Sequence, residues 1–248
     1  MTTLSSLMTA PTRSALEQDS GNFVLIDTLR QWGITFYSGV NGGGLIHVAK
    51  YLEPFTDLAQ AHNGVPSLLT MGEYVSGFVP VGYYLASGRV ACCLTTTGAA
   101  TKLGSSGLTD AKLHNIPAVY VIALNSTLSI GMAPLQDVSV YGMNIVPQLQ
   151  AELGDGCIVI DNVNTLERQL RRAQQVLLES RPVALAFHPD ILSKSAESDV
   201  PRIEKQRSLS RRDVEEFLET FPAQAEHRRV ILYVGSEATR SPNIEHLT

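Results

Sequence analysis

Short apolar runs, each followed or preceded by a segment with helical spacing, constrain the fold of this chain most strongly. The runs lie at 34–37, 66–71, 89–96, 118–124, 157–160 and 183–187. Between them, apolar residues recur with a helical period at 23–32, 45–52, 73–88, 99–114 and 166–178. Runs that are apolar on both faces are typical of strands in a parallel sheet covered by helices on either side. We therefore predict an α/β fold, a doubly wound parallel sheet flanked by helices.

Composition and charge limit the partners that this chain can have. Its 248 residues, 44% apolar and 17% charged, suffice for one core and the beginning of another unit. The net charge is −5 and there is no basic block, so we expect neither nucleic acid nor a membrane surface as a partner. Arg168, Arg171 and Arg172 sit at helical spacing and predict a solvated helix face.

Two further features bear on localisation. Residues 1–20 do not resemble a secretion signal, and no segment reaches the roughly 18 apolar residues that a membrane helix needs. Cys92, Cys93 and Cys157 lack the spacing of a zinc site or a CxxC motif and are expected to be buried, reduced thiols. These features favour a cytoplasmic protein.

The chain is predicted to contain more than one unit. Residues 1–20 form an N-terminal extension and 21–192 the main domain, while the polar stretch 193–212 is typical of a linker. A helix at 214–221 and a strand at 230–235 then begin a central domain over 213–248, which is too short to bury an apolar face alone. We expect the natural polypeptide to continue beyond this sequence.

Two glycine-containing segments suggest phosphate binding at first sight. The turn GVNGGG, from Gly39 to Gly44, lacks the GxGxxG spacing of a dinucleotide site, and close backbone approach to another planar ligand or substrate is a better use of it. The sequence GDG at 154–156 resembles the start of a magnesium-diphosphate motif. It precedes a strand and no asparagine completes the motif downstream, so we predict a turn.

Glu73 stands where an apolar strand runs into a helix. The simplest interpretation is an acidic residue at a helix N-terminus, where the helix dipole favours a negative charge. A lone carboxylate at the junction of a buried strand and a helix also suggests a chemical role.

Four motifs in this order resemble the N-terminal, pyrimidine-binding domain of thiamine-diphosphate enzymes of the acetolactate synthase and 2-oxo-acid decarboxylase superfamily. GVNGG at 39–43 is similar to the family's GYPGG, TTTGAATK at 95–102 to TSGPGATN, and IGMAPLQD at 130–137 to IGTDAFQE. Glu73 falls on the family's indispensable glutamate. The resemblance covers about 23–192, with departures at Asn41, Gly72, Thr97 and Gly98.

The resemblance implies a function for these residues. Glu73 would hydrogen-bond N1′ of the aminopyrimidine of thiamine diphosphate, and Gln136 would be an active-site glutamine. Bound with Mg²⁺, the cofactor would decarboxylate a pyruvate-like 2-oxo acid and pass the acyl unit to an acceptor. The implied cofactor-binding residues are Gly39, Val40, Asn41, Gly42, Gly43, Glu73, Thr96, Thr97 and Gly98.

The resemblance also implies partners. The Mg²⁺ ligands are expected in a diphosphate-binding domain of the rest of the polypeptide or of another chain, in a homodimer or tetramer. FAD, which some acetolactate synthases bind, has no support in this sequence. Carboligation, in preference to simple decarboxylation, rests on Gly43 and Gln136 alone.

Two alternatives remain open. The chain could be a subunit of a split 2-oxo-acid decarboxylase, or a noncatalytic interaction domain that has kept the fold. His62 and His114 are weaker candidates for acid–base catalysis, because neither belongs to a recognisable histidine pair.

Overall fold

The structure is a computed structural model that describes residues 20–196, 215–216 and 219. Contacts within the chain group residues 1–203 into one unit and 204–248 into a second. Of the predicted central domain only Glu215, Glu216 and Glu219 are described, and all three are helical. The predicted extension, most of the linker and the strand at 230–235 lie outside the described residues.

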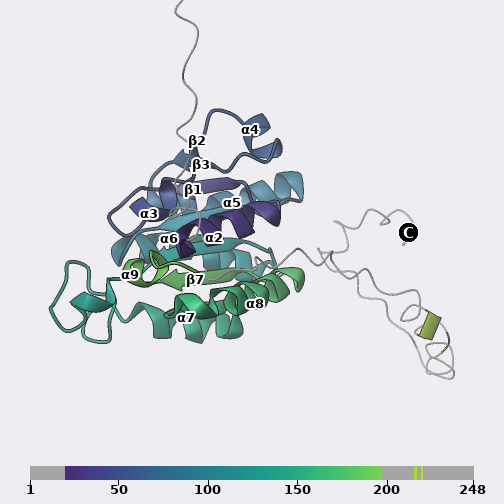
Figure 1. The fold of residues 1–248 in the computed structure, drawn as a ribbon. Coiled ribbons are helices and arrows are strands. Elements are labelled where there is room, and N and C mark those ends of the chain that lie inside the picture. Colours follow the sequence, from purple (N-terminus) through teal and green to yellow (C-terminus); the bar gives the residue numbers. More distant parts are fainter. Residues whose placement is uncertain (1–19, 197–214, 217–218, 220–248) are drawn as a thin grey trace, which may run out of the picture. The chain divides into compact units, whose positions relative to one another are not determined.

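The described part of the first unit is built on one parallel sheet with the strand order β2-β3-β1-β4-β5-β7-β6 (Figure 1). Every neighbouring pair of strands in it is parallel. The strands are β1 (Phe36–Gly39), β2 (Glu53–Pro54), β3 (Ser67–Thr70), β4 (Cys92–Thr95), β5 (Val119–Ala123), β6 (Cys157–Ile160) and β7 (Val183–Phe187). The predicted doubly wound parallel sheet is confirmed.

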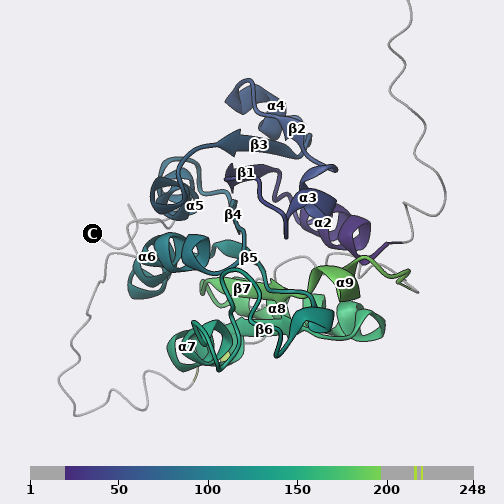
Figure 2. The same ribbon diagram turned by 90° about the vertical axis from the view of Figure 1, so that its left-hand side faces the viewer.

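Helices cover both faces of the sheet (Figure 2). One face carries α2 (Gly21–Gln31), α3 (Ile46–Ala49), α8 (Leu166–Leu178) and α9 (Pro189–Leu192). The other carries α5 (Glu73–Ser87), α6 (Ala99–Leu113) and α7 (Ile145–Leu153), and the short α4 (Leu58–His62) lies beside the edge strand β2. Each layer therefore buries one side of every central strand.

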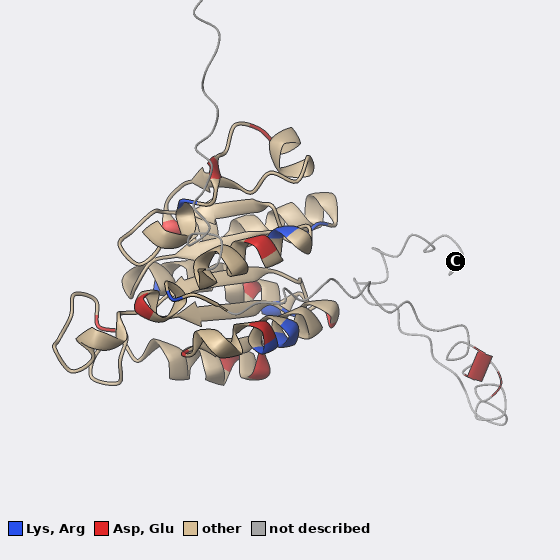
Figure 3. Cartoon of the chain, in the orientation of Figure 1, with Lys and Arg blue, Asp and Glu red and all other residues tan. Residues whose placement is uncertain are grey.

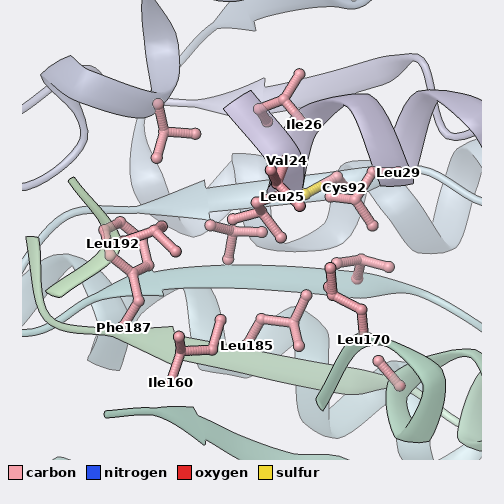
Figure 4. Close-up of a cluster of buried hydrophobic side chains, with 14 of the residues drawn as sticks. Val24, Leu25, Ile26, Leu29, Cys92, Ile160, Leu170, Leu185, Phe187 and Leu192 are labelled. Atoms are coloured by element: carbon pink, nitrogen blue, oxygen red, sulfur yellow. The ribbon is translucent and has the colours of Figure 1, made fainter. Parts of the chain in front are cut away.

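The alternation of side chains along the strands divides the core in two. Cys92 packs with α2 and α8, whereas its neighbour Cys93 packs on the side of α6 and α7, because successive strand residues point to opposite faces. Figure 4 shows part of the first cluster, with Leu25 of α2 beside Cys92 of β4 and with Leu185 and Phe187 on β7. Burial raises the pKa of the Cys93 thiol to about 12, as expected for an inert, reduced cysteine.

Several expected elements have different bounds. The first strand runs over Phe36–Gly39 and so includes the first glycine of the predicted turn. The helix expected at 45–52 is reduced to α3, because the chain turns into the two-residue strand β2 at Glu53–Pro54. In β3 only Ser67 is buried, since its one outer neighbour is that short strand, so the expectation of burial on both faces was wrong there.

Charged groups lie on the outside of this layered unit (Figure 3). Along α8, acidic and basic side chains are interspersed, and Glu167 pairs with Arg171 at 2.7 Å. Arg168, Arg171 and Arg172 are all exposed, as the sequence predicted. In residues 20–196 no helix has the length and apolarity needed to cross a bilayer.

Candidate functional site

Three predicted site segments leave the sheet at neighbouring positions. Gly39, the last residue of β1, pairs with Thr70 of β3 on one side and Leu94 of β4 on the other. In a parallel sheet the carboxyl ends of neighbouring strands lie at one edge. The turn 40–43, Glu73 and the turn 96–98 therefore begin side by side at the carboxyl edge of β3, β1 and β4.

Glu73 is the first residue of α5 and follows Gly72, whose N-cap position makes no side-chain hydrogen bond. Its side chain is half-buried. Within the described part of the chain, no hydrogen bond or ion pair engages the Glu73 carboxylate. The site thus contains a fixed carboxylate with free acceptor capacity.

A proline inside α5 ties this helix start to the sheet. Pro80 has no N–H, so the carbonyl of Ser76, four residues earlier, cannot make its helical hydrogen bond. The buried hydroxyl of Ser38 in β1 donates to that carbonyl at 2.8 Å, and the Ser76 hydroxyl donates to the carbonyl of Met71 at 2.8 Å. These bonds hold the first turn of α5 against β1.

The glycine-rich turn lies tightly on the neighbouring strand. A Cβ atom at Gly42 would come within 2.6 Å of Thr96 Oγ1, and one at Gly39 within 2.4 Å of the Leu94 carbonyl oxygen. Gly43, by contrast, is exposed and a Cβ atom there would meet nothing within 4 Å. The same is true of Gly72, so packing within the described residues does not account for glycine at either position.

The third segment differs in shape from the family's turn. Gly98 has φ +75° and ψ −110°, a conformation closed to the proline of the TSGPGATN motif. A Cβ atom at Gly98 would lie 2.6 Å from the Cβ of Gln136, and the Ala99 N–H donates to Gln136 Oε1 at 3.0 Å. Gly98 thus makes room for the glutamine, and Thr96 and Thr97 are half-buried beside it.

The structure therefore brings the predicted residues into one region. Gln136 reaches the start of α6 from the loop between β5 and α7, although it is distant in sequence from Gly98. Val40 is half-buried and Asn41 is exposed in the turn after β1. His114 lies at the C-terminal end of α6 and contacts Asp110 at 3.2 Å, while His62 is exposed at the end of α4, so neither belongs to this region.

Sequence reasoning missed two features near the site. Ile145, Leu149 and Leu153 are buried at a spacing of four residues in α7, a helix that is absent from the predicted elements, and this spacing was the available signal. The second is Asp190, which accepts hydrogen bonds from the backbone N–H and the hydroxyl of Thr127. Burial raises the pKa of Asp190, but these bonds outweigh it and hold the pKa below its usual range.

Two expectations remain, one about the GDG sequence at 154–156 and one about metal ligands. The GDG sequence forms the 3₁₀ turn Gly154–Gly156 before β6, as predicted, with Asp155 paired to Arg181. Among residues 20–196, 215–216 and 219, no group of three His, Cys, Asp or Glu side chains is placed to hold a metal ion.

The residues present fit an aminopyrimidine ring. The ring would need a carboxylate facing a ring nitrogen and an unobstructed backbone to lie against. Glu73 offers the first, and the open positions at Gly43 and Gly72 offer the second.

Comparison with known proteins supports this interpretation at the level of the family. The family model described as the thiamine pyrophosphate enzyme, N-terminal TPP binding domain matches residues 19–143, just over half of the chain. The chain is 23% identical over 241 residues to the acetolactate synthase isozyme 1 large subunit of Escherichia coli, which covers 93% of this chain and 39% of that protein. With isozyme 2 it is 25% identical over 215 residues, or 85% of this chain and 36% of the relative.

A solved structure agrees in fold. The X-ray structure of a protein from Mycobacterium smegmatis, assigned as a thiamin diphosphate-dependent enzyme, aligns with a TM-score of 0.65 at 16% identity. The alignment covers 85% of this chain and 38% of that one, so the chain spans well under half the length of the relatives it matches. The glycine-rich turn, Glu73 and the turn 96–98 lie at one edge of the sheet. The chain belongs to the thiamine pyrophosphate enzymes, and it corresponds to their N-terminal TPP-binding domain.

Proposed function

We propose that this chain is the pyrimidine-binding part of an enzyme that decarboxylates a pyruvate-like 2-oxo acid and transfers the acyl unit to an acceptor. One observation carries the proposal: Glu73 presents a half-buried carboxylate that no described residue engages, directly after Gly72 and at the same sheet edge as Gly43, two glycines that packing does not require. The relatives named acetolactate synthase support the choice of reaction.

Glu73 is the proposed catalytic residue. Its carboxyl group would hydrogen-bond a ring nitrogen of the pyrimidine and exchange a proton with it. Its place at the N-terminus of α5 favours the negative charge when the proton is away. Thiamine diphosphate, when bound, supplies the nucleophile and the electron sink of the decarboxylation.

The two turns would hold the pyrimidine by backbone contact. Gly42 and Thr96 already touch, so these turns form one continuous wall next to Glu73. The proposed cofactor contacts are Gly39, Val40, Asn41, Gly42, Gly43, Glu73, Thr96, Thr97 and Gly98. Gly43 leaves space for a second substrate over the ring, which favours carboligation.

Gln136 is the second proposed catalytic residue. Its Oε1 atom accepts the Ala99 N–H, which leaves the two N–H groups of the side-chain amide available as donors. Such donors suit the carboxylate or carbonyl oxygen of a 2-oxo acid.

For the parts of the holoenzyme outside this chain, the proposal is the one that the sequence predicted. A diphosphate-binding domain, from the same polypeptide or another chain, would hold Mg²⁺ and complete the site in a homodimer or tetramer. The chain covers only 39% of the acetolactate synthase isozyme 1 large subunit, which leaves room in such a protein for a diphosphate-binding domain. We also propose a cytoplasmic location, in line with three free, buried cysteines.

Replacement of Glu73 by Gln in the longest natural form of the polypeptide tests the proposal. We expect turnover of pyruvate to fall about 10²-fold or more, because the glutamine cannot exchange a proton. The unfolding midpoint should not change. Glu152→Gln, which alters a half-buried carboxylate on α7 that accepts a hydrogen bond from the Thr109 hydroxyl, is the matched control and should keep full turnover.

Calorimetric titration of thiamine diphosphate and Mg²⁺ separates the alternatives. Binding only in the longer form, weakened by Glu73→Gln, supports a shared active site. Tight binding to residues 1–248 alone would contradict the proposed division between two domains. Neither binding nor turnover of pyruvate by the wild-type protein in either form would favour the noncatalytic interaction domain, whereas wild-type binding and turnover in the Gln variant would contradict the role of Glu73.

A further inference from the structure

The loop between β5 and α7 has a polar side chain at its base that no assigned role explains. We propose that Asn125 is a positioning residue that fixes the backbone of Gln136 and thereby aims its carboxamide at the start of α6. The importance of this for catalysis rests on the proposed function, but the positioning itself does not.

Asn125 bonds to the chain on both sides of Gln136. Its Oδ1 atom accepts the Val138 N–H at 2.8 Å, and its Nδ2 atom donates to the Leu135 carbonyl at 3.4 Å. The first of these bonds has good length and the second is at the limit for a hydrogen bond. One side chain therefore spans the segment in which Gln136 lies.

Gln136 needs such support because its backbone is left-handed. Its φ is +55°, a conformation uncommon for residues other than glycine and one that persists only where the surroundings hold it. Ala133, three residues earlier, is also left-handed, with φ +49°. A loop with two such residues would relax if its closing bonds were removed.

The two sides of Gln136 are held very differently. After it, Asp137 accepts the Met143 N–H at 2.7 Å, in a turn that leads directly into α7. Before it, Leu128, Met132 and Leu135 are exposed by 78%, 76% and 88%, so this part of the loop gains no stability from burial. Asn125 connects the two sides, because it bonds to Leu135 in the exposed part of the loop and to Val138 in the part that leads into α7.

Asn125 is itself anchored to the sheet. Leu124 donates to the Phe187 carbonyl at 2.8 Å, continuing the pairing of β5 with β7. The Asn125 carbonyl lies 2.7 Å from His188 Nδ1, and because a carbonyl only accepts, that nitrogen carries the hydrogen. The backbone of Asn125 is therefore held by β7 and His188, and its side chain can hold the segment around Gln136 in place.

The consequence is visible at Ala99. The first N–H groups of a helix have no partner within it, and the Ala99 N–H is satisfied by Gln136 Oε1 at 3.0 Å. No hydrogen bond between described residues joins Asn125 to Ala99. A change at Asn125 can therefore affect the Ala99 amide only through Gln136.

Hydrogen exchange at the Ala99 amide tests this chain of contacts. In Asn125→Leu, which has a similar size and neither polar atom, exchange should accelerate about 5- to 10-fold, the equivalent of one hydrogen bond. Gln136→Leu should accelerate it equally. Asn125→Asp keeps the acceptor for Val138 and should stay within about 2-fold of wild type.

Two controls exclude a general loosening of the fold. Asn162→Leu removes a comparable bond, from the Asn164 N–H at 3.0 Å, in the turn after β6, and should leave Ala99 unchanged. If Asn125→Leu fails to fold, Asn125→Ala removes the same bonds without adding apolar surface. Wild-type exchange at Ala99 in whichever Asn125 variant folds would overturn the proposal.

Turnover by the longest form of the enzyme adds a separate test. Asn125→Leu should lower kcat more than it changes KM, and it should have no further effect in the Gln136→Leu background. Additive losses would show that Asn125 does not act through Gln136. Full turnover in Gln136→Leu would contradict the catalytic role of Gln136. Hydrogen exchange at Ala99 would still test whether Asn125 positions Gln136.

Discussion

Glycines occupy two regions of this protein for different physical reasons. Where α5 crosses α6, a Cβ atom at Gly107 would lie 1.9 Å from the Gly77 carbonyl oxygen, and one at Gly77 would lie 2.3 Å from that of Gly104. At the carboxyl edge of the sheet, Gly43 and Gly72 have open space where a Cβ atom would go. Open space alone does not indicate a ligand, because Gly82 on α5 has it too; the proposed site depends on the position of Gly43 and Gly72 at the sheet edge that carries Glu73.

The largest effect should come from filling the helix crossing. Gly107→Ala places a methyl group far closer to a backbone oxygen than van der Waals contact allows, so α5 and α6 must separate. We expect a loss of about 3 kcal/mol in the free energy of unfolding, measured by urea denaturation. Gly82→Ala, on an exposed part of α5, is the control and should not destabilise. Equal stability of both variants would remove the contrast between the two regions.

A smaller loss is expected where the crossing helix meets β1. Ser38→Ala leaves the buried Ser76 carbonyl without a donor, because Pro80 cannot supply one. The free energy of unfolding should fall by about 1–3 kcal/mol. Ser105→Ala also removes a hydroxyl bound to a helix carbonyl, that of Thr101, but inside α6 the carbonyl keeps its helical bond. A loss as large in this control would contradict the role given to Pro80.

The anchoring of the loop after β5 by Asp190 should depend on pH. The folded-state pKa of Asp190 is lowered, so its stabilisation is present above its unfolded pKa of about 3.9 and is lost as the pH falls through the folded value. Asp190→Asn should cost about 1–2 kcal/mol at pH 7, and this difference should shrink below about pH 4. Asp155→Asn, in an exposed ion pair with Arg181, should cost at most about 0.5 kcal/mol. A constant difference between wild type and Asp190→Asn across this range would refute the assignment.

The smallest effect on stability should come from the open glycine. Gly43→Ala has room for its methyl group, so the free energy of unfolding should change by no more than about 0.5 kcal/mol. Affinity for thiamine diphosphate, or turnover, should fall several-fold in the longest form of the protein. A destabilised Gly43→Ala would reveal a packing reason for this glycine, and wild-type binding and turnover in the variant would contradict a ligand contact at Gly43.

Much of the fold could be predicted because the central strands carry their own signal. The runs ending at Thr95 and Ala123 are apolar throughout and are buried on both faces. Edge elements carried less information, since β2 has two residues and α3 four, and their formation depends on neighbours distant in sequence. The helix α7 was missed because the preceding loop is itself apolar and hid the start of the periodic pattern.

The candidate site divides in the same way. Glu73 and the glycine-rich turn could be identified because each lies at the junction of a strand and the helix that follows it. Their assigned roles stay predictions. The contact between Gln136 and Ala99 could not be foreseen, because it depends on the left-handed backbone of residues in a long loop.

By itself, the sequence determined the parallel sheet and the residue types at its carboxyl edge, because apolar periodicity and the glycine and proline positions act locally. Only the tertiary structure decided which of these residues meet. Strand order places β3 and β4 on either side of β1, and that order follows from the packing of two helical layers and not from any local pattern. The same packing left the Glu73 carboxylate without a partner among the described residues and brought Gln136 to the start of α6.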